Sequence, residues 1–362
     1  MEKKTGLSPA KSRNICFDIL KIICVMAVVL IHSSSKAVED ATVFACPDFF
    51  FANIFNAVSR FGVPIFVMIS GALMLDENKI LPTKLIYSKY IKSIVYVFVF
   101  WSVLFTFVFA YQVPMNKGWT IHFDKVLTYF LQGHYHLWYL FMIVGLYIST
   151  PILRQFVRKN NEKTVVYFLK AGFIAQGVVP FILQLLKTFA DINLTETLEL
   201  FSLDTFLGFA FYYVLGWYLS NFTLKDKTQK IIYILGIISI VFSILFTYFV
   251  SVDQGKAFII TYRNFYFNNV LYASAIFLFF KKRFGQKSFS ENKSRIITKL
   301  SSLTFGIYIV HPFVIEALRT SFGKITPQPL SILLMWLTVT VVTAFICFVL
   351  SKIPGIKKLI KS

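Results

Sequence analysis

Ten apolar runs, most of them long enough to cross a lipid bilayer, divide this sequence of 362 residues. An α-helix rises about 1.5 Å per residue, so about 17–25 apolar residues cross the hydrocarbon core. With 57% hydrophobic residues and a mean hydropathy of +0.68, the chain carries more apolar surface than a soluble fold needs. The predicted spans are Ile15–Ser33, Arg60–Leu75, Tyr87–Tyr111, His136–Leu153, Val165–Leu186, Thr205–Ser220, Ile231–Val250, Phe265–Phe280, Leu300–Leu318 and Leu330–Leu350.

These runs predict an all-α, polytopic membrane bundle of about ten helices. The second and sixth runs are short, and they can extend backward through Phe49–Ser59 and Leu198–Asp204. No polar interval is long enough for a second domain. We therefore expect a basic arm over residues 1–14, one membrane domain over residues 15–350 and a basic tail over residues 351–362.

The distribution of Lys and Arg predicts the orientation. With the N-terminus in the cytoplasm, the arm, the even-numbered loops and the tail hold 27 basic residues, whereas the odd-numbered loops hold 9. Cytoplasmic loops carry an excess of Lys and Arg, so both termini are predicted to be cytoplasmic. The net charge of +20 is thus spread over helix ends and does not indicate nucleic-acid binding.

Three polar side chains interrupt the first apolar run and share one helical face. Asp18 and His32 differ by roughly −40° around an α-helix, and Lys21 and His32 differ by roughly +20°. Ionisable groups inside a bilayer are costly unless they face the protein interior or water, so such a stripe is a candidate functional site.

Each member of this stripe has a functional and a structural interpretation. His32 can act as a general base toward a hydroxyl, or it can mark the outer end of the span before three serines. Asp18 and Lys21 can form an intramembrane ion pair, or both can reach the cytoplasmic interface.

A metal site is not expected. The four cysteines form no CxxC or Cys/His metal-binding spacing, and two or three of them lie in apolar helix, where cysteine usually packs as a small residue. His134 and His136 are two residues apart, which on a helix places them on different faces.

Five segments together resemble acyltransferase family 3, the polytopic membrane O-acyltransferases. The pattern Asp-x2-Lys-x10-His of the first span resembles the first helix of that family. Further resemblances run in the family's order up to about residue 315, and they are Ser59–Gly71 (SRFGVPIFVMISG), Lys84–Trp101, His136–Pro151 and Phe305–Pro312 (FGIYIVHP). The nearest subgroup is the stand-alone O-acetyltransferases of bacterial surface polysaccharides, which implies a multi-pass protein of the bacterial cytoplasmic membrane.

The resemblance implies a donor and an acceptor. The donor would be cytoplasmic acyl-CoA, most often acetyl-CoA, and no permanently bound cofactor is implied. Lys84, Lys89 and Lys92 would bind its phosphates, although the positive-inside pattern alone also accounts for these lysines. The family more often has Arg where this chain has Lys21, and paired arginines where it has Lys89 and Lys92, so charge is kept while bidentate geometry is lost.

The acceptor would be a hydroxyl of a surface glycan or lipid-linked sugar. His136 and Trp138 begin the fourth span, where aromatic residues either bind sugar or anchor in the interface. His311 and Glu316 lie inside the ninth span, beside the backbone carbonyl that Pro312 leaves unpaired. Arg60 can bind a glycan phosphate or anchor at the interface.

The sequence therefore predicts an enzyme that moves an acyl group across the membrane. His32 is the expected catalytic residue, either as the base or as a carrier of the acyl group, and Asp18 and Lys21 shape the channel for the thioester. The alternative is a secondary transporter or glycan-lipid translocase, which should show two similar halves with matching broken helices. The sequence shows no such repeat.

Overall fold

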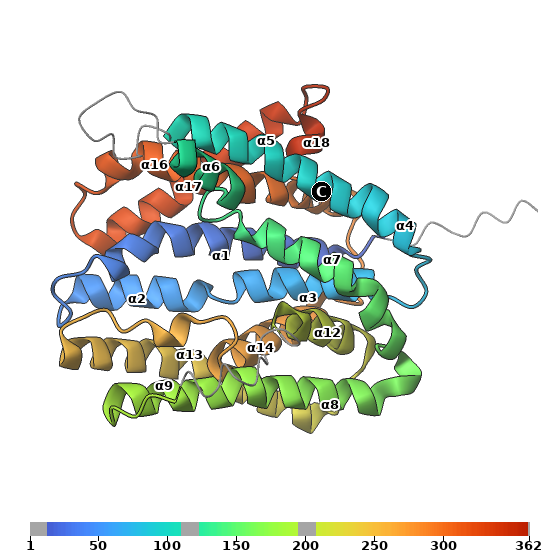
Figure 1. Cartoon of the computed structure of the whole chain (residues 1–362), viewed down its shortest axis with the longest axis horizontal. Coiled ribbons are helices and arrows are strands. Elements are labelled where there is room, and N and C mark those ends of the chain that lie inside the picture. Colours follow the sequence, from blue (N-terminus) through green and yellow to red (C-terminus); the bar gives the residue numbers. More distant parts are fainter. Residues whose placement is uncertain (1–12, 110–122, 195–207, 361–362) are drawn as a thin grey trace, which may run out of the picture.

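Every regular element of this computed structural model is a helix, over the residues it describes, which are 13–109, 123–194 and 208–360. The helices lie side by side with their axes roughly parallel (Figure 1). The bounds of the long helices are α1 Ile15–Glu39, α2 Pro47–Ser59, α3 Gly62–Met74, α5 Lys92–Phe109, α6 Phe123–Gln132, α7 Trp138–Phe156, α8 Glu162–Gly172, α9 Val179–Phe189, α12 Gly208–Asn221, α13 Asp226–Gln254, α14 Phe267–Phe284, α15 Glu291–Ser301, α16 Thr304–Phe322 and α17 Gln328–Leu350. The short ones are α4 Thr83–Leu85, η1 Ile86–Ile91, η3 Lys159–Asn161, η4 Phe173–Val178, η5 Ile260–Tyr262 and α18 Lys357–Ile360.

The all-α polytopic class predicted from the sequence is confirmed, and each of the ten predicted spans contains helix. In the described residues, seven helices are long and apolar enough to cross a membrane, and the pair α15–α16, bent by 47°, makes an eighth. The remaining two predicted spans correspond to α12, of 14 residues, and α14, of 18 residues. The start of the span Thr205–Ser220 and the end of the span Tyr87–Tyr111 lie outside the described residues.

The second span begins earlier than its apolar core and is broken in the middle. Helix α2 ends at Ser59, α3 begins at Gly62, and together they form one candidate span, Pro47–Met74. Pro64 has no N–H to donate to the carbonyl of Arg60, which removes one helical hydrogen bond at this point. The break leaves Arg60 at the joint between the two helices.

The closest approach in the core is between α3 and α12. A Cβ atom added to Gly71 would lie 1.8 Å from the carbonyl oxygen of Tyr213, and one added to Gly216 would lie 2.0 Å from that of Met68. Only glycine allows backbones to meet at this distance, as in other membrane helix pairs. Beside this contact lies Trp217, which is fully buried.

Hydrogen bonds join several basic loops at one end of the bundle, which we call the basic end. Arg154, near the end of α7, donates to the carbonyls of Met74 and Lys79 at 2.8 Å each. Lys281, in the last turn of α14, donates to the carbonyl of Phe222 at 2.9 Å. The hydroxyl of Tyr218, in α12, donates to Glu162 at the start of α8 at 3.2 Å, which links these two groups. The loops after α3, α7, α12 and α14 therefore lie at the same end of the bundle.

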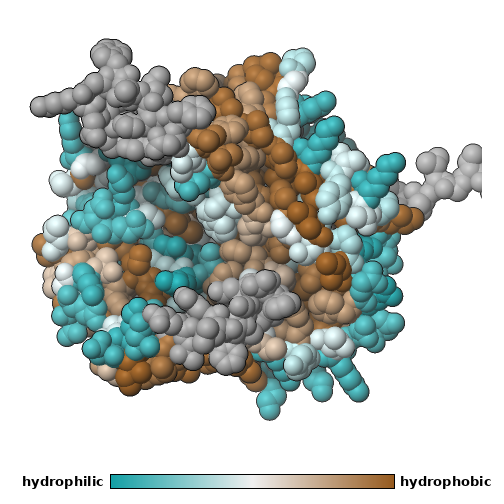
Figure 2. Space-filling model, viewed as in Figure 1, coloured by the Kyte–Doolittle hydropathy of each residue, from teal (hydrophilic) through white to brown (hydrophobic). Residues whose placement is uncertain are grey.

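The outer surface between the two ends is apolar. Large hydrophobic side chains of α5, α13 and α17 are exposed, among them Phe107, Ile237 and Phe345. Figure 2 shows most hydrophilic residues toward the two sides of the view and hydrophobic surface between them. A surface of this kind is matched to lipid hydrocarbon.

The C-terminal helix α18 packs back into the bundle. Leu359 and Ile360 are buried, and the indole nitrogen of Trp101 in α5 donates to the carbonyl of Leu359 at 3.0 Å. Gly306 of α16 makes room for Ile360, because a Cβ there would come within 3.1 Å of it.

Replacing Gly71 by Leu should prevent α3 and α12 from packing at their present distance. Because the obstructing atoms belong to the backbone of Tyr213, they cannot move aside as a side chain would, and the cost should be about 3 kcal/mol or more. We expect a clear fall in the melting temperature of the detergent-solubilised protein. Gly145→Ala is the control, since a Cβ at Gly145 meets nothing within 4 Å. Equal melting temperatures for the two variants would contradict the packing described here.

The predicted sidedness is tested by reporter fusions. A reporter placed after Ser362 should be active only as a cytoplasmic reporter, and one inserted near Asp191 only as an external one. The physical reason is the threefold excess of Lys and Arg in the arm, even-numbered loops and tail. An externally active C-terminal fusion would overturn the orientation.

Candidate active site

Helix α1 brings the polar stripe to three different depths. Asp18 is buried near the basic end, where Arg13 donates to its carboxylate at 2.5 Å and the hydroxyl of Ser301 donates at 2.7 Å. Among the described residues the ion-pair partner of Asp18 is thus Arg13 and not Lys21. A carboxylate with several such donors is stable at this depth, because its charge is both paired and hydrogen-bonded.

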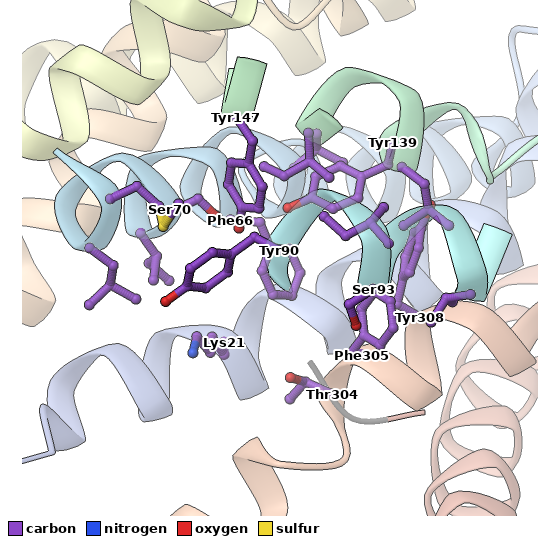
Figure 3. Close-up of a pocket in the computed structure, with 18 of the residues that line it drawn as sticks. Lys21, Phe66, Ser70, Tyr90, Ser93, Tyr139, Tyr147, Thr304, Phe305 and Tyr308 are labelled. Atoms are coloured by element: carbon purple, nitrogen blue, oxygen red, sulfur yellow. The ribbon is translucent and has the colours of Figure 1, made fainter. Parts of the chain in front are cut away.

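A cavity of about 270 Å³ lies between α1, α3, η1, α5, α7 and α16. Four tyrosines line it, and we call it the tyrosine pocket; they are Tyr90, Tyr139, Tyr147 and Tyr308. Figure 3 shows Lys21 of α1 and Thr304 of α16 on one side of this pocket, and Tyr139 and Tyr147 of α7 on the opposite side. Most other lining residues are aliphatic or aromatic, so the pocket is an apolar passage with a few hydroxyl groups.

Two lysines line the tyrosine pocket near the basic end. Lys21 projects from α1, and Lys79 follows α3, where its backbone carbonyl is held by Arg154. The ammonium of Lys79 lies 5.2 Å from the centre of the Tyr90 ring. The ammonium of Lys89 lies 5.7 Å from the centre of the same ring. These cations make one end of the pocket suited to an anionic group.

Four histidines gather at the other end of the tyrosine pocket, and we call them the histidine cluster: His32, His134, His136 and His311. The ring centres of His32 and His311 are 5.2 Å apart, and those of His136 and His311 are 5.6 Å apart. The Nδ1 atoms of His134 and His136 are 3.1 Å apart.

The expectation that His134 and His136 lie on different faces of a helix is wrong. The chain between α6 and α7 is a turn, which begins at Gly133 with φ +70°, so the two rings converge. Within the described residues, however, no group of three or more His, Cys, Asp or Glu has the geometry of a metal site.

Tyr308 forms the wall between the tyrosine pocket and the histidine cluster. Its ring lines the pocket and lies 5.5 Å from that of His136 and 6.2 Å from that of His311. Its hydroxyl donates to the backbone carbonyl of His136, which fixes the ring in place. The ring centre of Tyr139 lies 5.4 Å from that of Tyr308.

A second, polar cavity of about 480 Å³ lies beyond the cluster, at the opposite end of α1. We call it the Lys36 pocket. Its lining includes Lys36 of α1, Asp40 just after α1 and Arg319 of α16, and His32 is part of its wall. Helix α1 therefore supplies Lys21 to one cavity and His32 to the other.

Arg60 lies in the half of the bundle that contains His32. Its guanidinium donates to the side-chain oxygen of Asn56 and rests 4.3 Å from the ring centre of Tyr262. Asn56 in turn donates to the hydroxyl of Ser34 at 3.0 Å, which links this group to α1. The cation is held in place by α2 and η5, without lining either pocket.

The other predicted site residues lie at varying distances from the cluster. His136 is buried within it, whereas Trp138 is exposed and packs against Phe209. Glu316 pairs with Arg319 at 2.5 Å, beside the Lys36 pocket. Lys84, Lys89 and Lys92 are exposed on α4, η1 and α5 and do not line the tyrosine pocket.

The family model described as an acyltransferase domain, that of acyltransferase family 3, matches residues 14–352, nearly the whole chain. This chain belongs to acyltransferase family 3. The membership confirms the resemblance found in the sequence, and it favours acyl transfer over transport. No curated protein and no solved structure matches the chain.

In this membrane acyltransferase, sequence reasoning missed the residues that line the tyrosine pocket. Tyr90 and Tyr147 are uncharged, and aromatic residues are abundant in this chain, so no pattern separated these tyrosines from packing residues. Lys79 lies between two predicted spans, where a lysine is part of the general excess of positive charge. One signal was available for Tyr308. It lies one helical turn before His311 and Pro312, so it faces the same way as a histidine that was already a candidate.

Proposed function

We propose that this acyltransferase is a transmembrane O-acetyltransferase. In this proposal, it moves an acetyl group from cytoplasmic acetyl-CoA to a hydroxyl of an extracytoplasmic or lipid-linked glycan. The observation that carries the proposal is that two dissimilar cavities lie on either side of one histidine cluster. The apolar cavity with lysines is lined by Tyr308, which packs against His136 and His311, and the polar cavity is lined by His32.

The tyrosine pocket is suited to the donor. The pantetheine arm and thioester of acetyl-CoA are slender and largely uncharged, and they match a passage lined by Val28, Phe66 and Ile143. The phosphates would remain at the basic end, near Lys21 and Lys79. We propose that Lys89, which flanks Tyr90, and the exposed Lys84 and Lys92 add to the positive potential there.

The Lys36 pocket is suited to the acceptor. Its lining combines hydroxyl, amide, acidic and basic groups, such as Asp48, Gln328 and Ser331, which can hydrogen-bond to a sugar. Arg319 is neutralised by Glu316, so this cavity has no strong excess of positive charge. We therefore propose that it recognises hydroxyl groups rather than a highly charged acceptor.

In the proposed reaction, His32 accepts the proton of the acceptor hydroxyl. The oxygen attacks the thioester carbonyl carbon, the carbon–sulfur bond breaks, and the proton leaves with the sulfur as coenzyme A thiol. A second route starts with attack by His32 on the thioester and passes through an acyl-histidine that the hydroxyl then resolves. Both routes place the reacting carbon between Tyr308 and His32.

The proposed setting is the cytoplasmic membrane of a bacterium, with the basic end facing the cytoplasm. The partners are then membrane lipids, acyl-CoA and a glycan acceptor, with no nucleic acid. A permanently bound cofactor is not part of the proposal, because the thioester already carries an activated acyl group.

His32→Ala should abolish glycan acetylation while the protein stays folded and able to bind acetyl-CoA. Loss of a general base alone should lower the rate by about 10² to 10⁴-fold, whereas loss of an acyl carrier should leave almost none. The measurement is alkali-labile acetate in the envelope of source cells that lack the native gene and carry the variant.

Lys21→Arg is the matched control for this stripe. It keeps the charge and introduces the residue that is usual in the family, so it should retain activity if Lys21 acts through charge. Near-normal acetylation by His32→Ala would show that the catalytic assignment is wrong.

Lys79→Ala should weaken the binding of acetyl-CoA by about 10-fold, because one charged contact to a phosphate is lost. The loss should shrink at high salt, since such contacts are screened. The dissociation constant can be measured by calorimetry on the purified protein. The double change Lys89→Ala and Lys92→Ala should have a smaller effect, because neither lysine lines the pocket.

Lys163→Ala serves as the control for general charge, because Lys163 is exposed at the start of α8 and distant in the chain from every lining residue. An unchanged dissociation constant for Lys79→Ala, or an equal loss for Lys163→Ala, would exclude a specific phosphate contact.

A further inference from the structure

The ring of His311 is held by a backbone carbonyl of α16 that Pro312 leaves without its helical hydrogen bond. Pro312 has no N–H, so the carbonyl of Tyr308, one turn earlier, loses its normal helical partner. The ring of His311 fills this position, with Nδ1 lying 2.7 Å from the carbonyl oxygen of Tyr308 and 3.2 Å from that of Ile307. A carbonyl can only accept a hydrogen bond, so Nδ1 carries the proton.

The other ring nitrogen of His311 is left with a lone pair and no partner. His311 is completely buried, and within the part of the chain that the structure describes, its Nε2 has no hydrogen bond. The buried neighbour His136 differs, because its Nε2 donates to the carbonyl of Ile309 and its Nδ1 faces His134. A buried acceptor without a donor is costly, so its retention calls for a use.

The ring that faces His311 from α1 is His32. Their planes are inclined by 33°, with the ring centres 5.2 Å apart, and His32 alone of the two lines the Lys36 pocket. Tyr135 also packs on His32, with the ring centres 5.1 Å apart. The other charged or titratable groups around this pair are His134, His136 and Tyr308, with Arg60 on the α2 side and the Glu316–Arg319 pair on α16.

We propose that His311 is a positioning residue that acts through His32 by accepting a hydrogen bond, and then a proton, from it. This inference rests on the proposed function and deepens it. A rotation of the His32 side chain brings one of its ring N–H groups to Nε2 of His311. That bond selects the tautomer of His32 whose other nitrogen has its lone pair directed at the substrate.

The proton balance follows from this arrangement. The acceptor hydroxyl gives its proton to the free nitrogen of His32, while the proton on the other nitrogen of His32 moves to Nε2 of His311. When the carbon–sulfur bond breaks, the protons move back in the opposite order, and the sulfur leaves as the thiol. Both imidazoles end in their starting tautomers, and no further reactant is needed.

Two substitutions at His311 separate this role from simple packing. In His311→Asn the side-chain amide can still donate to the carbonyl of Tyr308, but nothing replaces Nε2. In His311→Gln an amide oxygen can lie near the position of Nε2, where it accepts a hydrogen bond without taking the proton. We expect the Asn variant to lose about 10²-fold in kcat, with the KM for acetyl-CoA unchanged, and the Gln variant to recover part of that loss.

The assay uses membranes of source cells that lack the native gene and carry each variant, supplied with [14C]acetyl-CoA, and it measures alkali-labile label in the envelope. The melting temperature and the acetyl-CoA affinity of each purified variant show whether it is folded. Wild-type kcat in His311→Asn would overturn the proposal, and so would an equal loss in the Asn and Gln variants.

Pro312→Ala decides the matter if both His311 variants are unstable. It keeps His311 but restores an N–H that competes for the carbonyl of Tyr308, so the orientation of the ring is loosened. We expect a reduced kcat with an unchanged KM, and a wild-type kcat would overturn the proposal. If the wild-type protein itself transfers no label, the proposed function has failed, which is distinct from the failure of this inference.

Discussion

The cost of placing a polar group in hydrocarbon is the constraint on which this structure depends. Several polar side chains deep in the bundle are paired with other parts of the chain. Asp18 accepts hydrogen bonds from Arg13 and Ser301, and Arg154 donates to the carbonyl of Met74 at the end of α3. The bonds made by Ser301 and Arg154 join segments that are far apart in sequence, so the need to satisfy polar groups also sets which helix ends meet. Packing of glycine against backbone, as between α3 and α12, then brings the helices into contact.

Helix α1 is central to this arrangement. It packs against α2, α3, α14, α15, α16 and α17, so its polar face is enclosed by protein rather than lipid. One helix thereby serves two cavities, with Lys21 in the first and His32 in the second. The distance between these two residues along α1 is roughly 16 Å, which is half the thickness of a bilayer core.

Much of the fold could be predicted from the sequence because hydropathy is a strong signal in a membrane protein. The ten apolar runs became helices, and the helical period placed Lys21 and His32 on one face. The turn at Gly133 was not predicted, because a break within an aromatic, histidine-containing segment has no hydropathy signal, and so the convergence of His134 and His136 was missed. The tyrosine pocket was missed for a related reason. Its walls come from five segments separated in sequence, and only tertiary packing brings them together.

The position of Tyr308 has a consequence for the ion gradient across the membrane. A membrane that stores energy as an ion gradient loses it through any continuous water-filled path. In this protein the two cavities share no lining residue, and Tyr308, whose hydroxyl donates to the carbonyl of His136, lines the first cavity and packs against the histidine cluster. If the proposed function holds, an acyl group passes from one face of the membrane to the other without a continuous water-filled path through the protein.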